Sequence, residues 1–204
     1  MIKNIIFDLG NVLLSWKPEE YLINNGFTKD SRETILKDVF RTPEWLALDD
    51  GTISLDEAAE SIASKSSLNR GEIYAVFDLR TKILFPLEGN TRMLPWLKKE
   101  GFKLYYLSNF PEDIFDEVEA KYDFFRIFSG GLISAKAKVS KPDERIFRKL
   151  LDTYSLLPEE SLFIDDTHAN AISAETLGIS VIHLSEPSSL KDKLQNFLGI
   201  SIPV

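Results

Sequence analysis

Five side chains suited to phosphoryl chemistry are spread along the sequence: Asp8, Ser108, Lys141, Asp165 and Asp166. Three carboxylates brought together repel one another, and each is driven toward protonation unless a cation lies among them. Oxygen ligands without Cys or His suit Mg²⁺, which combines one or two carboxylates with waters and a substrate phosphate. An aspartate can attack phosphorus to form an aspartyl phosphate, and a lysine and a serine can hold the transferring oxygens. If the fold brings these residues together, they form a magnesium-dependent phosphoryl-transfer site.

Short apolar runs of strand length alternate along the chain with longer segments of helical periodicity. This alternation predicts an α/β fold, in which a Rossmann-like parallel sheet is flanked by helices. Strands are expected at 3–8, 103–108, 161–165 and 180–184. In such sheets, ligands bind outside the carboxyl ends of the strands. We therefore expect Asp8, Ser108 and the Asp165–Asp166 pair to meet at one edge of the sheet, with Lys141 just before a nearby helix.

Capping and turn residues mark the ends of several helices. Gly101 is expected to end a helix over 91–100 and Gly178 one over 167–177, because glycine commonly follows the last helical residue. Asp143 is placed to cap a third helix. These helices would cover the faces of the sheet.

The stretch from 15 to 85 has little strand signal and contains helix starts instead. Ser54, with Glu57 three residues later, forms a capping box. The chain is therefore expected to leave the sheet after its first strand, build a helical insertion over 15–85, and return. The α/β core would then comprise residues 1–14 and 86–204.

Composition limits the classes of partner. The chain has 204 residues, with 24 Lys and Arg against 32 Asp and Glu, and a formal net charge of −8. Nucleic acid is not an expected partner, because phosphate backbones are bound by Lys and Arg patches. Cysteine is absent, which excludes disulfides and thiolate chemistry. The apolar runs are shorter than the roughly 20 residues of a membrane span, and no signal peptide is recognisable. A cytoplasmic protein without membrane partners is expected, of unspecified oligomeric state.

The motifs together resemble a known family. In order, they are DxGxV at Asp8, Ser-Asn at Ser108, Lys-Pro at Lys141 and Asp-Asp at Asp165. This series resembles the four motifs of the haloacid dehalogenase-like (HAD) hydrolase superfamily, and the resemblance covers nearly the whole chain. The helical insertion resembles the small C1-type cap of that superfamily. The pattern DLGNV, with DDxxxN ending at Asn170, is most similar to the α-D-glucose-1-phosphate phosphatase-like branch.

The resemblance implies a magnesium-dependent phosphatase for a small phosphorylated metabolite, with a sugar phosphate as the expected example. Asp8 would be the nucleophile and pass through an aspartyl phosphate. The main-chain carbonyl of Gly10 would bind Mg²⁺ together with Asp8, Asp165 and Asp166. Which member of the acidic pair binds the metal directly stays open, because the other can act through water or orient a lysine.

The resemblance also implies how the substrate is held. Ser108 and Lys141 would hold the phosphoryl group, and Asn109 would offer its backbone amide to a phosphoryl oxygen. In the insertion, Trp45 is expected to pack between helices. A second interpretation places Trp45 and Asp49 in the cap loop that faces the phosphoryl site, where Asp49 could hydrogen-bond a sugar hydroxyl.

Gly10 departs from the family pattern. Most phosphatases that the sequence resembles carry an aspartate at this position, two residues after the nucleophile, as general acid and base. General acid–base catalysis is typically worth about 10² to 10⁴ in rate, so its loss should slow turnover without abolishing it. We therefore expect unusually acidic leaving groups to be favoured.

Two alternatives to a phosphatase remain. A 2-haloacid dehalogenase-like hydrolase shares the nucleophilic aspartate and the cap, although it needs no metal and so leaves the acidic pair at Asp165 and Asp166 without a purpose. A degenerate member could bind a phosphorylated ligand or serve regulation without turnover, because Gly10 replaces the acid/base residue.

Overall fold

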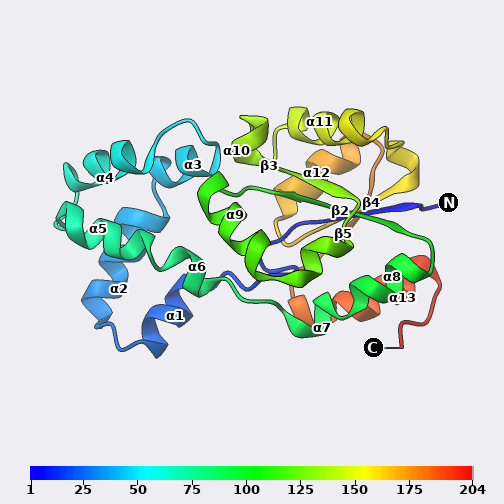
Figure 1. Cartoon of the computed structure of the whole chain (residues 1–204), viewed down its shortest axis with the longest axis horizontal. Coiled ribbons are helices and arrows are strands. Elements are labelled where there is room, and N and C mark those ends of the chain that lie inside the picture. Colours follow the sequence, from blue (N-terminus) through cyan, green and yellow to red (C-terminus); the bar gives the residue numbers. More distant parts are fainter. Residues whose placement is uncertain (204) are drawn as a thin grey trace.

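The computed structural model describes residues 1–203 and contains a five-stranded parallel sheet of order β3-β2-β1-β4-β5 (Figure 1). The strands are β1 (Asn4–Phe7), β2 (Lys103–Ser108), β3 (Gly130–Ile133), β4 (Ser161–Asp165) and β5 (Ser180–His183). From β1 the chain builds outward through β2 and β3, then returns to β4 on the other side of β1. The order reverses between β1 and β4, and such a switch point is where open α/β sheets bind ligands.

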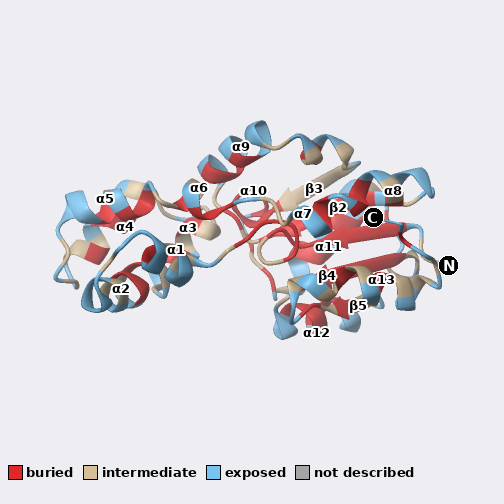
Figure 2. Cartoon of the chain, turned by 90° about the horizontal axis from the view of Figure 1, so that it is seen from below, coloured by how far each residue is buried: buried red, intermediate tan, exposed pale blue. Residues whose placement is uncertain are grey.

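Helices cover both faces of the sheet, and β1 and β4 lie fully buried between them, whereas the edge strands β3 and β5 are partly exposed (Figure 2). The core helices are α7 (Glu88–Thr91), α8 (Met93–Lys99), α9 (Glu112–Lys121), η2 (Asp123–Ile127), α10 (Ser134–Ala137), α11 (Glu144–Tyr154), η3 (Pro158–Glu160), α12 (His168–Thr176), η4 (Pro187–Ser189) and α13 (Leu190–Leu198). Successive strand residues point to opposite faces. Accordingly, Ile5 and Phe7 join the apolar cluster that includes α8, α9 and α13, while Ile6 joins the cluster that includes α11 and α12. The continuous apolar run of β1 is thus explained by burial on both sides.

The segment from Pro18 to Ile83, which follows β1, folds into helices beside the core, at the end remote from the two termini (Figure 1). They are α1 (Pro18–Asn24), α2 (Lys29–Ile35), the π-helix η1 (Leu36–Phe40), α3 (Pro43–Asp49), α4 (Leu55–Ala63), α5 (Arg70–Phe77) and α6 (Arg80–Ile83). They enclose an apolar cluster of their own. The expected capping box is present at α4, where the Ser54 hydroxyl accepts from the Glu57 amide and the Glu57 carboxylate accepts from the Ser54 amide.

The edge strand β3 is absent from the sequence-based prediction. It reads Gly-Gly-Leu-Ile, without the β-branched run that marks a strand. Tyrosine rings pack against both glycines: a Cβ at Gly131 would lie 2.3 Å from the Tyr106 ring, and one at Gly130 would lie 2.3 Å from the Tyr154 ring. The Tyr154 hydroxyl also donates to the Gly131 carbonyl and accepts from its amide. Glycine is therefore needed where the strand would otherwise show its signal.

The remaining predictions agree with the structure to within a few residues. The helix expected over 91–100 corresponds to α8, which the short helix α7 precedes, and α12 spans most of 167–177. The Asp143 carboxylate accepts from the Arg145 amide and caps α11, as expected. Within residues 1–203, no helix has the length and apolarity needed to cross a membrane.

Candidate active site

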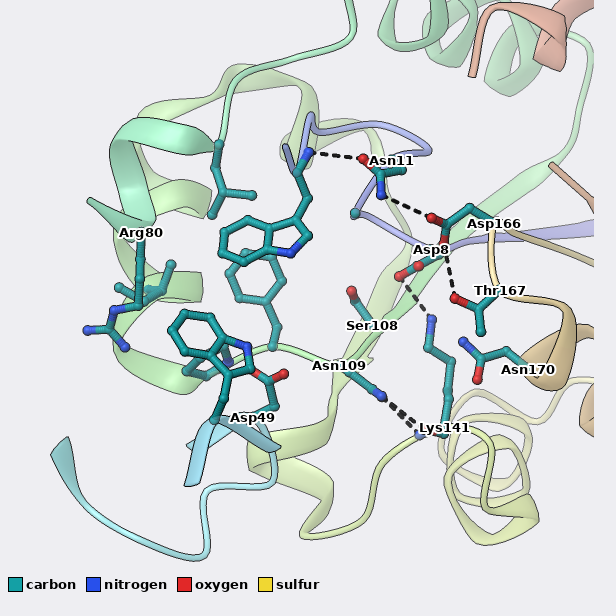
Figure 3. Close-up of a pocket in the computed structure, with 17 residues that line it drawn as sticks. Asp8, Asn11, Asp49, Arg80, Ser108, Asn109, Lys141, Asp166, Thr167 and Asn170 are labelled. Carbon is teal, nitrogen blue, oxygen red and sulfur yellow. Dashed lines mark hydrogen bonds and ion pairs between the residues drawn. The ribbon is translucent and has the colours of Figure 1, made fainter. Parts of the chain in front are cut away.

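Lys141 forms ion pairs with aspartates at the carboxyl ends of β1 and β4, and Figure 3 shows its contact with Asp8. Asp8 follows β1 and Asp165 ends β4. The Lys141 Nζ lies 2.9 Å from Asp8 Oδ1 and 2.6 Å from Asp165 Oδ2, and it donates to the Leu107 carbonyl at 2.9 Å. All three ammonium hydrogens therefore have acceptors, and the buried ammonium is fixed between two strand ends.

Both oxygens of Asp165 are occupied by protein donors. Oδ2 accepts from Lys141, Oδ1 accepts from the Thr167 amide at 2.7 Å, and the Asn170 side-chain amide lies 3.1 Å from each oxygen. Asp165 is fully buried. Its carboxylate thus holds Lys141 and the start of α12, and Asn170 steadies the loop that carries the acidic pair.

Asp166 has a different environment. It is only partly buried and lines the cavity in which Asp8 and Lys141 lie. Its Oδ2 accepts from the Asn11 side-chain amide at 3.0 Å, and its Oδ1 accepts from the Thr167 hydroxyl at 3.3 Å. Lone pairs of both oxygens remain available on the cavity side.

The charges at the site are strongly perturbed in the absence of a metal. Burial raises the pKa of Asp8 to about 7, despite the opposing effect of the Lys141 ammonium, and the Asp165 carboxylate raises it further. Burial alone would lower the pKa of Lys141, but Asp8 and Asp165 outweigh it and the net pKa is raised. The single ammonium does not fully offset the acidic cluster, so a further cation would favour the ionised form of Asp8.

The donors fit a magnesium ion. Asp8, Asp165 and Asp166 each offer a carboxylate oxygen, and these oxygens lie within 4.8 Å of one another. Gly10 lines the same cavity. Hard oxygen donors with room for water are the ligands that Mg²⁺ prefers. Because the oxygens of Asp165 are already occupied, Asp8 and Asp166 are the carboxylates best placed to bind an ion.

Ser108 and Asn109 come from the end of β2. The Ser108 side chain is buried and lines the cavity, and its hydroxyl lowers the pKa of Asp8. The Asn109 side chain donates to the Lys141 carbonyl and accepts from the Lys141 amide, each at 2.9 Å. Asn109 therefore fixes the loop that carries Lys141.

The cavity, about 220 Å³ in volume, is also walled by Trp45 and Asp49 of the insertion. The turn after α3 is tied to the core: the Ser134 hydroxyl donates to the Asp49 carbonyl, the Ser140 hydroxyl donates to the Asp50 carboxylate, and Lys138 Nζ donates to the Gly51 carbonyl. Trp45 packs among the helices of the insertion, and its side chain also faces the cavity.

Several cavity residues were not identified from the sequence, among them Asn11, Trp16 and Arg80. Asn11 adopts a left-handed conformation (φ 54°), which asparagine tolerates better than most residues. Its side-chain oxygen, Oδ1, accepts from the Trp16 backbone amide. Arg80 links α6 to α9 through Asp113 at 2.9 Å. Asn11 was part of the DLGNV motif, so the sequence contained a signal for it. No local sequence pattern distinguishes Trp16 or Arg80 from ordinary structural residues.

Comparison with known sequences identifies relatives that align with nearly the whole chain. A sesquiterpene phosphatase of Aspergillus oryzae is 27% identical over 197 residues, which cover 97% of each chain. A drimenol cyclase of Aspergillus calidoustus is 26% identical over 98% of this chain, which spans only 37% of that longer protein.

Solved structures have the same fold. A HAD family enzyme from Bacteroides thetaiotaomicron, in complex with magnesium and inorganic phosphate, has a TM-score of 0.69 and 25% identity over 89% of this chain and 93% of its own. L-2-haloacid dehalogenase from Xanthobacter autotrophicus has a TM-score of 0.68 at 17% identity, covering 100% of this chain and 85% of its own, and shows likeness of fold alone. A sequence model of haloacid dehalogenase-like hydrolases matches residues 2–178. The chain belongs to the haloacid dehalogenase-like hydrolase family.

Proposed function

We propose that this hydrolase is a magnesium-dependent phosphatase that cleaves small phosphate monoesters through an aspartyl phosphate on Asp8. The observation that carries the proposal is the buried Lys141 ammonium. It lies 2.9 Å from Asp8 Oδ1, beside the cluster of Asp8, Asp165 and Asp166 carboxylates. Residues 15–85 act as the cap that closes the cavity over the substrate, and residues 1–14 and 86–204 form the catalytic core.

In the first half-reaction, an Asp8 oxygen attacks phosphorus, the bond from phosphorus to the alcohol oxygen breaks, and the aspartyl phosphate forms. Lys141 exchanges its contact with Asp8 for one with a phosphoryl oxygen, and Ser108 and the Asn109 backbone amide hold the other phosphoryl oxygens. Water then attacks the phosphorus of the intermediate, which releases inorganic phosphate and restores Asp8. Bound Mg²⁺ supplies positive charge that neutralises the acidic cluster and the phosphoryl oxygens.

A phosphatase is better supported than the two alternatives. The relative named as a sesquiterpene phosphatase aligns along its full length, and a related structure holds magnesium and phosphate. A dehalogenase would have no use for the cavity-facing Asp166 carboxylate; release of halide from a chlorinated acid would overturn this conclusion. A binding protein without turnover would accumulate phosphorylated Asp8 and release no phosphate.

Removal of metal is the direct test of the proposed function. With acetyl phosphate as substrate, EDTA should reduce phosphate release to background, and excess Mg²⁺ should restore it. The physical reason is that Asp8 lies beside two further carboxylates and has a pKa of about 7 without metal. Without the cation, the negative charge of the cluster also repels the phosphoryl group of the substrate. Full activity in EDTA would contradict the proposal.

The two members of the acidic pair should behave differently. We propose that Asp166 binds the metal directly and that Asp165 positions Lys141. Asp166→Asn should raise the Mg²⁺ concentration for half-maximal activity by at least about tenfold, since even outer-shell partners contribute 10- to 100-fold to metal affinity. Asp165→Asn should lower kcat by about 10²-fold at saturating Mg²⁺, because a fixed charge donor is displaced.

Magnesium titrations of activity for both variants decide between these roles. Asp152→Asn, on the exposed face of α11, is the matched control and should behave like the wild type. A shift in metal requirement for Asp165→Asn, with only a loss of kcat for Asp166→Asn, would reverse the assignment.

The sugar phosphate expected from the sequence would be recognised by hydrogen bonds from the cap. Asp49 is the side chain proposed for that contact. The guanidinium of Arg80, the other charged group on this wall, is bound to the Phe77 carbonyl and the Asp113 carboxylate, and its remaining nitrogen is buried. Asp49 would therefore have to recognise a sugar almost alone.

A further inference from the structure

The side chains that line the cavity change from polar to mostly apolar with distance from Asp8. Around Asp8 its walls are polar and include Ser108, Lys141 and Asp166. The side formed by the insertion and by the segment after β2 is apolar. The apolar side chains there are Trp16, Trp45, Leu84, Phe110, Pro111 and Ile114, which we call the apolar slot. Figure 3 shows Asp49 and Arg80 on the same side, away from Asp8.

The apolar slot is built from well-packed groups. The rings of Trp16 and Trp45 are stacked, with centroids 5.7 Å apart and an interplanar angle of 28°. Trp45 also packs edge-on against Phe40. Opposite the insertion, Phe110 and Ile114 belong to the main core cluster. Side chains from two separate apolar clusters therefore meet across the cavity, and they form a fixed hydrocarbon surface rather than a loose surface patch.

Few polar groups interrupt the apolar slot. Burial raises the pKa of Asp49 well above its usual range; the neighbouring Asp50 raises it further, and Arg80 opposes this shift. Across the cavity, Asp8 and Lys141 are paired with each other. This shift favours the protonated form of the Asp49 carboxyl, which is compatible with an apolar environment and offers one donor. Several sugar hydroxyls would lose water here without finding partners, and unpaired buried polar groups are strongly disfavoured.

We propose that the substrate is a phosphate monoester whose alcohol carries a hydrocarbon group next to the ester, seated in the apolar slot. The inference rests on the proposed phosphatase function and specifies its substrate class. It also replaces the sugar phosphate that the sequence suggested. The phosphoryl group would lie at Asp8, and the hydrocarbon between Trp16 and Trp45 of the insertion and Ile114 of α9.

Two esters with the same kind of leaving group test this inference: cyclohexylmethyl phosphate and glucose 6-phosphate. Both are primary monoesters on a six-membered ring, so their chemistry is matched and their polarity is not. We expect kcat/KM to be at least about tenfold higher for cyclohexylmethyl phosphate, the size of a hydrophobic-pocket effect. Equal values, or a preference for glucose 6-phosphate, would overturn the inference.

Variants connect the preference with the apolar slot. Trp16→Gln should reduce the ratio of the two kcat/KM values several-fold, because it puts an amide in the slot. Ile114→Thr, on the opposite wall, should act in the same direction and provides a second measurement if Trp16→Gln folds poorly. Phe27→Gln is the control, since Phe27 packs in the cap but does not line the cavity. A ratio that both slot variants leave unchanged would contradict the proposal.

Acetyl phosphate distinguishes failure of the proposed phosphatase function from failure of the proposed substrate class, because its organic group is too small to fill the apolar slot. Failure to hydrolyse acetyl phosphate with Mg²⁺ would overturn the proposed function and this inference together. Hydrolysis of acetyl phosphate with a preference for glucose 6-phosphate would overturn the inference alone. Hydrolysis of acetyl phosphate with a preference for cyclohexylmethyl phosphate would support both.

Discussion

Asp8→Asn should lower phosphatase activity by at least about 10³-fold, because losing a covalent nucleophile leaves only binding and electrostatic contributions. The substitution preserves size and polarity beside Lys141. It removes the anionic oxygen that must attack phosphorus. Phosphate release from acetyl phosphate, with saturating Mg²⁺, is the measurement. A variant that retained more than a tenth of wild-type activity would rule out Asp8 as nucleophile.

A trapping experiment makes this result specific for the mechanism. Rapid denaturation of the wild type during turnover should give a peptide containing Asp8 with the added mass of one phosphoryl group, and Asp8→Asn should give none. Folding is checked by the thermal unfolding midpoint. The Lys141 ammonium keeps its 2.6 Å contact with Asp165 in the variant, so the buried charge is not left unpaired. Phosphorylation at another residue in both proteins would contradict the assignment.

The placement of the chemistry follows from the order of strands. Asp8, Ser108 and Asp165 stand at the ends of apolar runs, and parallel strands bring such ends to one edge. The sheet and the juxtaposition of these residues were therefore predictable from local patterns. Lys141 lies in a loop, and the resemblance to a family, rather than periodicity, singled it out.

The roles of Asp165 and Asp166 depend on their side-chain contacts, which cannot be read from two identical neighbouring residues in a sequence. Asp165 turns toward Lys141 and Asn170, whereas Asp166 turns toward Asn11 and the cavity. Successive residues at a strand end point in opposite directions. Their roles diverge for that reason, and only the side-chain partners show which is which.

The apolar slot was equally inaccessible from sequence. Trp16 and Trp45 lie 29 positions apart, and Ile114 lies far from both. Each can be explained locally as an ordinary core residue. Their common surface forms only because the turn at Asp49–Gly51 is tied to Ser134 and Lys138 of the core. The proposed substrate selectivity would thus depend on how the insertion docks on the core.

Gly10→Asp should raise kcat for cyclohexylmethyl phosphate by about 10²-fold, within the range of general acid catalysis. The alcohol of this ester leaves poorly unless it is protonated, and the wild type has no side chain at position 10 to supply the proton. There is room for one: a Cβ built on Gly10 would meet its nearest neighbour, the Trp16 Cβ, at 4.0 Å, and Gly10 has no positive φ. The carbonyl proposed to bind Mg²⁺ is retained.

Comparison with p-nitrophenyl phosphate identifies the cause of any gain. Its leaving group is stable as an anion, so Gly10→Asp should change its kcat by less than about threefold. Gly10→Asn is the matched control, because an amide of the same shape cannot deliver a proton in this way. Equal gains for both esters, or a gain with Gly10→Asn, would show that the new side chain acts through binding. An increase confined to the alkyl ester would show that the wild-type site is complete for phosphoryl capture and lacks only the proton donor.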